Sequence, residues 1–343
     1  MIREFGADTA SFDWTQTAVR TSLLCGVSLL LCLALGVVTH HERQGMNAAY
    51  GAMSVAFGSF QRDKRAGHVS RILASFVMAA SILVGGLVGG SLAFSVLAVG
   101  VWGLWCGMLV SLSTESMWVG IQACVALFLA ISYELTGGRQ FERAAFVLAG
   151  GLLQASAIYM FCKLGWLDDC APQSDVAALE AELRPHVNLR SAHFRFALRM
   201  SAVLAIAEAL SRYMGVQNAY WVPMTTLLVL KPDLVASFAR GLARIAGTLI
   251  GAGLLTLFVA HARPDKWSLA VLTVLFAVLC YNLLRVNYAL YTVCITSYVV
   301  LMLSFAGMPV QRVVVARVVN TLIGGAVGLA GRAIAARWEV RAA

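Results

Sequence analysis

The feature that most constrains this chain is a succession of apolar blocks, each about 15 to 25 residues long, separated by short charged breaks. A helix rises 1.5 Å per residue, so roughly 20 residues cross a hydrocarbon core about 30 Å thick. The blocks at 22–38 and 270–284 run without alternation, whereas the strands of a membrane barrel alternate over about 10 residues. The pattern therefore predicts an all-α polytopic membrane protein.

The overall composition supports this interpretation. The 343 residues are 60% hydrophobic and 13% charged, with a mean hydropathy of +0.79, which lies outside the range of soluble globular domains. The net charge of +9 is also found in nucleic-acid-binding proteins. Here, however, the basic residues lie between apolar blocks and do not form one soluble face, so no nucleic-acid partner is expected and the lipid bilayer is the predicted environment.

The apolar blocks, divided at the charged breaks, predict about twelve transmembrane helices. The second and the eighth are the weakest, because residues 218–230 would span only about 20 Å and include Pro223. A short helix at membrane depth needs a covering of protein or a water-filled cavity, so this segment is a candidate lining for a pathway. The predicted spans are 18–39, 46–61, 71–90, 92–112, 115–133, 144–162, 195–212, 218–230, 241–260, 268–284, 287–306 and 312–334.

The spans divide into two halves that resemble each other. Arg20 and Arg199 each open a helix, and Gly36 and Gly215 follow sixteen residues later. Each half has an even number of spans, so the repeats are expected to be parallel, with a shared pathway at the interface between them. The predicted divisions are a first six-helix half (1–165), a cytoplasmic linker (166–194) and a second six-helix half (195–343).

The distribution of basic residues predicts the orientation. With the N-terminus inside, 18 of the 26 Lys and Arg residues fall on the inner side, and the others, including Arg143 and Arg317, fall toward the outer side. This bias indicates that both termini are cytoplasmic. The cysteines form no C-x-x-C motif, so a disulfide framework is not expected.

The most distinctive motifs lie in the second half. They are Tyr220-Trp221-x-Pro223, a helix that begins Arg244-x-x-Gly-Thr-x-x-Gly251, and a late helix with Arg317-x-x-x-Thr-x-x-Gly324. In these motifs the sequence resembles the fusaric acid resistance and aromatic acid exporter family of bacterial inner-membrane proteins. In the first half the resemblance is diluted, since 51–53 and 71–75 depart from the corresponding motifs.

The resemblance implies a multi-pass transporter of the bacterial inner membrane that exports organic carboxylate anions, aromatic ones in particular, with no enzyme activity. Large members of the family carry a sizeable cytoplasmic domain, where this chain has only a linker of about 30 residues, so a short form is expected. The halves are also similar to plant aluminium-activated malate transporters, which leaves a passive anion channel open. A membrane scaffold without transport activity is a third alternative, and a homo-oligomer or a periplasmic adaptor also stays open.

The candidate substrate-pathway residues combine cations, aromatic rings and small polar groups. Arginine or lysine inside a span costs about 2.5–3.5 kcal/mol, so such residues indicate an anion-binding role or, alternatively, snorkelling to the lipid surface. Rings could stack on an aromatic substrate, and the competing interpretation is an interfacial belt or packing. Glu208, four residues before Arg212, is interpreted as a structural ion pair. The candidates are Tyr220, Trp221, Pro223, Thr225, Lys231, Asp233, Arg244, Tyr288, Thr296 and Arg317.

No cofactor and no metal are expected. The histidines lie in loops or at helix ends without ligand spacing, and the sequence contains neither a phosphate-binding loop nor a nucleophile elbow.

Overall fold

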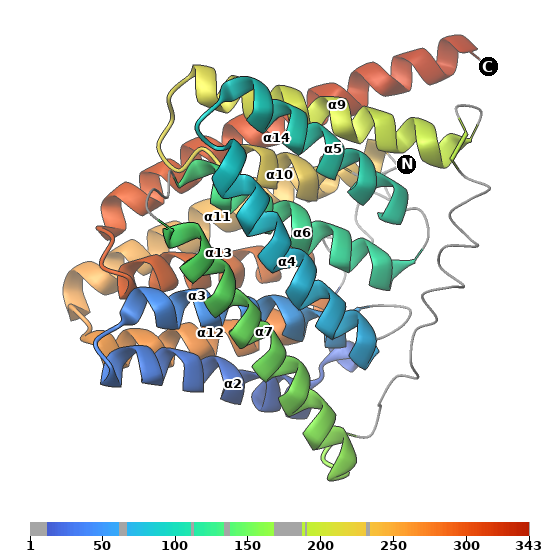
Figure 1. Cartoon of the computed structure of the whole chain (residues 1–343). Coiled ribbons are helices and arrows are strands. Elements are labelled where there is room, and N and C mark those ends of the chain that lie inside the picture. The colour runs from blue at the N-terminus through green and yellow to red at the C-terminus, as the bar shows by residue number, and fades with distance from the viewer. Residues whose placement is uncertain are drawn as a thin grey trace.

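The computed structural model describes residues 12–61, 67–110, 113–133, 138–167, 187–188, 191–230 and 234–342, and the regular structure in these ranges is helical (Figure 1). The all-α fold class is therefore confirmed. A helix lies at each of the twelve predicted positions. They are α2 (Val19–Val38), α3 (Glu42–Ala56), α4 (His68–Val88), α5 (Leu92–Val110), α6 (Thr114–Ser132), α7 (Arg139–Lys163), α9 (Ala192–Tyr213), α10 (Trp221–Val229), α11 (Leu234–Ala262), α12 (Lys266–Val286), α13 (Tyr288–Phe305) and α14 (Val310–Ala342).

Nine helices in the described ranges are long and apolar enough to cross a membrane, namely α2, α4 to α7 and α11 to α14. The other three are α3, α9 and α10. Two of them, α3 and α10, are the segments predicted to be the weakest spans, with 15 and 9 residues. The third, α9, carries four charged side chains between Arg195 and Arg212, which lowers its hydropathy. Linker 166–194 lies largely outside the described residues.

The helices pack in a repeated set of pairs. In the first half, α3 packs against α2 and α7, and α4 packs against α6 and α7. In the second half, α10 packs against α9 and α14, and α11 packs against α13 and α14. The halves are joined where α5 lies beside α9, at one edge of the bundle in Figure 1, and where α12 lies beside α2, at the opposite edge.

Small residues, several of them at Gly-x-x-x-Gly spacing, allow these helices to approach closely. A Cβ on Gly251 would lie 2.5 Å from the backbone oxygen of Val293, and one on Gly324 would lie 2.4 Å from that of Val222. Both glycines are therefore at positions of close helix packing. Gly90 is not, because a Cβ there would meet nothing within 4 Å.

The N-terminal end of α10 is fixed by backbone geometry and by one side chain. The preceding turn has left-handed residues at Gly215 (φ 60°) and Asn218 (φ 53°), which are among the residue types that tolerate this conformation best. The side-chain amide of Asn320 on α14 donates to the carbonyl oxygens of Gln217 (2.7 Å) and Asn218 (3.2 Å). Pro223 lies in the first turn of α10, where the missing N–H has no intrahelical partner to lose.

Two polar features bear on the sequence expectations. The Glu208–Arg212 ion pair is confirmed, with 3.0 Å between Glu208 Oε1 and Arg212 Nε. The expectation that no disulfide forms was wrong, because Cys162 near the end of α7 is disulfide-bonded. The absence of a C-x-x-C motif does not exclude bonds between cysteines at other spacings.

Candidate functional site

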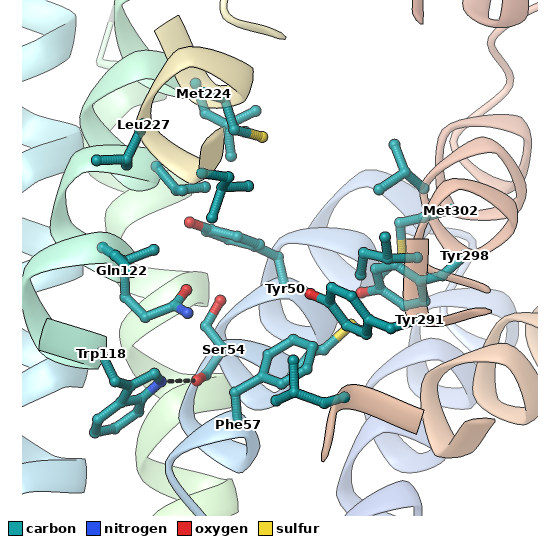
Figure 2. A pocket seen from close by; sticks show the side chains of 18 of the residues that line it. Tyr50, Ser54, Phe57, Trp118, Gln122, Met224, Leu227, Tyr291, Tyr298 and Met302 are labelled. Carbon is teal, nitrogen blue, oxygen red and sulfur yellow. Dashed lines mark hydrogen bonds between the residues drawn. The ribbon is translucent and has the colours of Figure 1, made fainter. Parts of the chain in front are cut away.

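A cavity of about 640 Å³ lies between the two halves of the bundle. Its walls come mainly from α3 and α6 of the first half and from α10 and α13 of the second (Figure 2). The lining extends from Met117 to Tyr133 at the end of α6, and from Asn287 to Leu303 along α13. At 1.5 Å per residue, each stretch is about 24 Å long. The cavity therefore follows most of the length of these helices.

The middle of the cavity is apolar and aromatic, with a few hydroxyl and amide groups. Figure 2 shows Tyr50 projecting from α3 toward the same space as Tyr291 and Tyr298 from α13. The indole N–H of Trp118 donates to the backbone oxygen of Ser54 at 3.1 Å and so ties α6 to α3. The other labelled lining residues are Phe57, Gln122, Met224, Leu227 and Met302. Such a lining suits an organic molecule with an apolar body.

Positive charge dominates the groups of the described lining that are charged at neutral pH, which are Arg143, Arg240, Arg244, Arg285, Arg317 and the carboxylate of Asp13. Three of the guanidinium groups lie over aromatic rings. The Cζ atoms of Arg143, Arg240 and Arg317 are 4.7, 4.6 and 4.9 Å from the ring centroids of Tyr133, Tyr288 and Trp221, respectively. This geometry attracts each cation to the electron-rich ring face and holds it at the cavity wall.

Arg244 and Arg317 are the most deeply buried of these cations, with 2% and 1% of their surface exposed. Among the described residues, neither forms an ion pair with a carboxylate. Nε of Arg244, and Nε and Nη1 of Arg317, have no hydrogen-bond partner there. A buried charge is costly unless it is paired and hydrogen-bonded, so the two guanidinium groups provide a site that an anion would complete.

The packing of α10, α11 and α14 positions these two arginines. Gly247 and Gly251 bring α11 against α13, one and two turns after Arg244. Gly324 brings α14 against α10, two turns after Arg317. Since α10 is short and its start is fixed by Asn320, the ring of Trp221 lies under the Arg317 guanidinium. The glycine contacts thus position the cations from neighbouring helices.

The structure brings five of the candidate residues together and separates others. Thr225 lies against Gly324 of α14, and Thr296 lies against Gly251 of α11, so both are on helix-packing faces outside the lining. Pro223 is buried in α10 and also lies outside the lining. Lys231 and Asp233 fall outside the described residues. The candidates that line the cavity are Tyr220, Trp221, Arg244, Tyr288 and Arg317.

The first-half lining was missed by sequence reasoning. Tyr50, Trp118 and Gln122 lie in helices whose motifs differ from those of the second half. Arg143 could have been found from spacing. It precedes Gly150-Gly151 by seven residues, as Arg317 precedes Gly324-Gly325.

Within the described part of the chain, no group of three or more His, Cys, Asp or Glu side chains is arranged to hold a metal ion. The described lining of the cavity offers arginine side chains, aromatic rings and hydroxyl groups.

Parts of this chain are similar to known bacterial proteins. Residues 204–331 match the family described as fusaric acid resistance protein-like. The chain is 31% identical over 159 residues to the protein ORF2 of Neisseria gonorrhoeae, which covers 46% of this chain and 37% of that protein. It is 35% identical over 154 residues to the inner membrane protein YccS of Escherichia coli K12, covering 43% of this chain and 20% of YccS.

A shorter match links the chain to the transporter YdhK of Escherichia coli K12, with 29% identity over 76 residues, 22% of this chain and 11% of YdhK. The chain thus aligns with 37% or less of the length of these curated relatives. No solved structure matches it. The matched segment contains α10, α11, α12 and α13 with most of α14, and therefore both buried arginines. Residues 204–331 of this chain are thus similar to the fusaric acid resistance protein-like family.

Proposed function

We propose that this chain is a secondary transporter of the bacterial inner membrane that exports organic carboxylate anions, aromatic ones in particular, through the cavity between its halves. The observation that carries the proposal is the pair of buried guanidinium groups, Arg244 and Arg317, which line an aromatic cavity without a carboxylate partner among the described residues. A charged substrate group would replace the missing counter-charge, and the rings would contact an apolar body.

The helix pairings support a pathway shared by two parallel repeats. If α2 to α7 correspond in order to α9 to α14, then α3–α7 corresponds to α10–α14, and α4–α6 corresponds to α11–α13. The contacts between the halves follow the same rule, because α5–α9 corresponds to α12–α2. Twelve spans with both termini inside follow from this proposal, and the cavity then lies near the pseudo-two-fold axis.

The charges of the lining favour anions over cations at every stage of passage. A carboxylate accepts hydrogen bonds from a guanidinium in a forked geometry, and each charge-assisted bond contributes about 1.5–3 kcal/mol. A cation would meet repulsion from the same groups. The name of YccS as an inner membrane protein and that of YdhK as a transporter support the same location and class for this chain.

The test is uptake of labelled benzoate into inverted membrane vesicles from cells with and without the protein. A pH gradient and a membrane voltage are imposed separately. Uptake that depends on the protein and on the pH gradient supports a coupled exporter. Arg317→Gln is expected to remove most of the uptake, whereas Arg312→Gln, on the exposed face of the same helix, should leave it unchanged. Equal uptake by both variants would exclude Arg317 from the pathway.

A passive anion channel is a second candidate, favoured by one observation. Asp13 is the only carboxylate in the described lining, so few groups there could carry a coupled proton. A membrane potential supplies about 2.3 kcal/mol per 100 mV for each monovalent anion, which would sustain a gradient of roughly 40-fold. Uptake driven by voltage alone would favour the channel. Reconstituted protein that moves no anion under either condition would favour a scaffold.

A further inference from the structure

Arg244 and Arg317 form one electrostatic unit within the cavity. They come from different helices, α11 and α14, yet Arg244 is close enough to act electrostatically on Arg317. Both groups also act on the hydroxyl-bearing ring of Tyr291, which lines the cavity. Tyr288, which packs against Tyr291 with 5.8 Å between ring centroids, lies beside Arg244. Both rings thus line the same cavity as the two buried positive charges.

A monoanion can neutralise the charge of only one of these two arginines. If a single carboxylate bound at Arg317, the guanidinium of Arg244 would stay buried at 2% exposure without a described counter-charge. The remaining charge would still carry its desolvation cost. Two acidic groups on one molecule would neutralise both arginines. The translational and rotational entropy of association would then be lost only once.

We propose that the cavity takes a dianion, with one acidic group at Arg244 beside Tyr288, the other at Arg317 above Trp221, and an apolar body against Tyr291. This assignment rests on the proposed function and narrows it from organic anions to those with two separated acidic groups.

The other cations of the lining have different surroundings. Arg240 and Arg285 each have further interactions within the protein, and Arg240 also lies on the Tyr288 ring. Arg143 is partly exposed and stacks on Tyr133 at the end of α6. Arg244 and Arg317 are therefore the two sites at which deep burial and missing partners coincide.

The three benzenedicarboxylates provide a probe of this geometry. Phthalate, isophthalate and terephthalate share one ring and hold two carboxylates at increasing separation, and benzoate is the monoanionic control. Binding of each is measured by isothermal titration calorimetry to the purified full chain in detergent at neutral pH. The isomer whose carboxylates fit the two arginines should bind with a stoichiometry of one and about tenfold or more tighter than benzoate, the factor that corresponds to about 1.4 kcal/mol.

Arginine variants distinguish a dianion that bridges both arginines from an anion that is attracted only by the positive charge of the cavity. In Arg317→Gln and in Arg244→Gln, the affinity for the best dicarboxylate should lie within about threefold of the affinity of the same variant for benzoate, so that the preference for the dianion is lost. Arg312→Gln should keep the preference of the wild type. Unfolding curves of each variant confirm that it folds. If Arg317→Gln does not fold, Arg317→Lys keeps the charge, loses the forked geometry and should keep part of the preference.

The outcomes distinguish this inference from the function on which it rests. Benzoate binding as tightly as every dicarboxylate would overturn the dianion and leave the anion transporter standing. Two benzoate molecules binding per chain would also overturn it, because each arginine would then hold its own monoanion. Binding of none of the four compounds, together with absence of uptake in vesicles, would overturn both.

Discussion

Arg212 on α9 donates a hydrogen bond from Nη2 to the backbone oxygen of Gly89 at 2.6 Å, so a side chain of the second half caps the end of α4 in the first half. The same nitrogen lies 3.2 Å from the backbone oxygen of Ile131, near the end of α6. Nε of Arg212 is bonded to the buried carboxylate of Glu208. The positive charge thus lies at the negative ends of two helices, where it is stabilised.

Removal of this group should weaken the junction between the halves. Arg212→Gln leaves the Glu208 carboxylate and two helix-terminal carbonyls without their donor, and breaking a buried ion pair from one side costs about 3 kcal/mol or more. We expect a lower unfolding temperature in detergent, followed by intrinsic fluorescence. Lys266→Gln, at an exposed ion pair with Glu42, is the control and should change the temperature little. Equal effects would show that Arg212 is not a structural link.

The contact of α14 with α10 should tolerate no additional methyl group at Gly324. A Cβ added at this position would lie 2.4 Å from the backbone oxygen of Val222, which cannot move without displacing α10. Gly324→Ala is expected to lower both the unfolding temperature and the uptake of the anion, because Arg317 and Trp221 lie on the two displaced helices. A Cβ on Gly253 meets nothing within 4 Å, so Gly253→Ala should be neutral or slightly stabilising.

The ring of Trp221 should contribute to the positioning of Arg317. A cation over an aromatic face gains about 0.5–2 kcal/mol, and an aliphatic side chain provides no such attraction. Trp221→Phe should therefore retain more anion affinity than Trp221→Leu, with a difference of about threefold or more in titration calorimetry. Identical affinities for the two variants would indicate that Trp221 acts through its volume alone.

The buried hydroxyl groups of two tyrosines allow an effect on stability to be distinguished from an effect on transport. Those of Tyr298 and Tyr281 have no hydrogen-bond partner among the described residues, and an unsatisfied buried hydroxyl costs about 1–3 kcal/mol. Both Tyr298→Phe and Tyr281→Phe should raise the unfolding temperature. Only Tyr298 lines the cavity, whereas Tyr281 stacks on Phe60 with 5.0 Å between centroids.

Anion uptake should therefore change in Tyr298→Phe and stay as in the wild type in Tyr281→Phe. Uptake by inverted vesicles, normalised to the amount of protein, provides the measurement. A loss of uptake in Tyr281→Phe would place that hydroxyl in the pathway as well.

The ion pair between Glu42 and Lys266 predicts a pH dependence at the surface. The hydrogen bond from Lys266 holds the pKa of Glu42 below its ordinary value. A carboxylate with a lowered folded-state pKa contributes stability above its unfolded value, near 4.3, and loses this contribution as the pH falls through the lowered one. The difference in unfolding temperature between the wild type and Glu42→Gln should therefore be constant near neutral pH and vanish in acid. A difference that grows in acid would contradict the pairing.

The length and hydropathy of each segment determined much of this structure. The twelve helix positions, the short α10 with Pro223 and the weak second span are local properties, since a helix forms and enters a bilayer largely according to its own residues. The exceptional cost of arginine within apolar sequence likewise singled out Arg244 and Arg317, both of which line the cavity.

Tertiary packing decided which faces of these helices form the cavity. On α13, Tyr288 and Tyr298 face the cavity, whereas Thr296 packs against Gly251, and nothing in the order of these residues reveals which side α11 covers. The contribution of Tyr50 and Trp118 also depends on where α3 and α6 meet the second half. A pathway between halves is formed by residues far apart in the sequence, so its lining depends on long-range contacts that the properties of single segments do not encode.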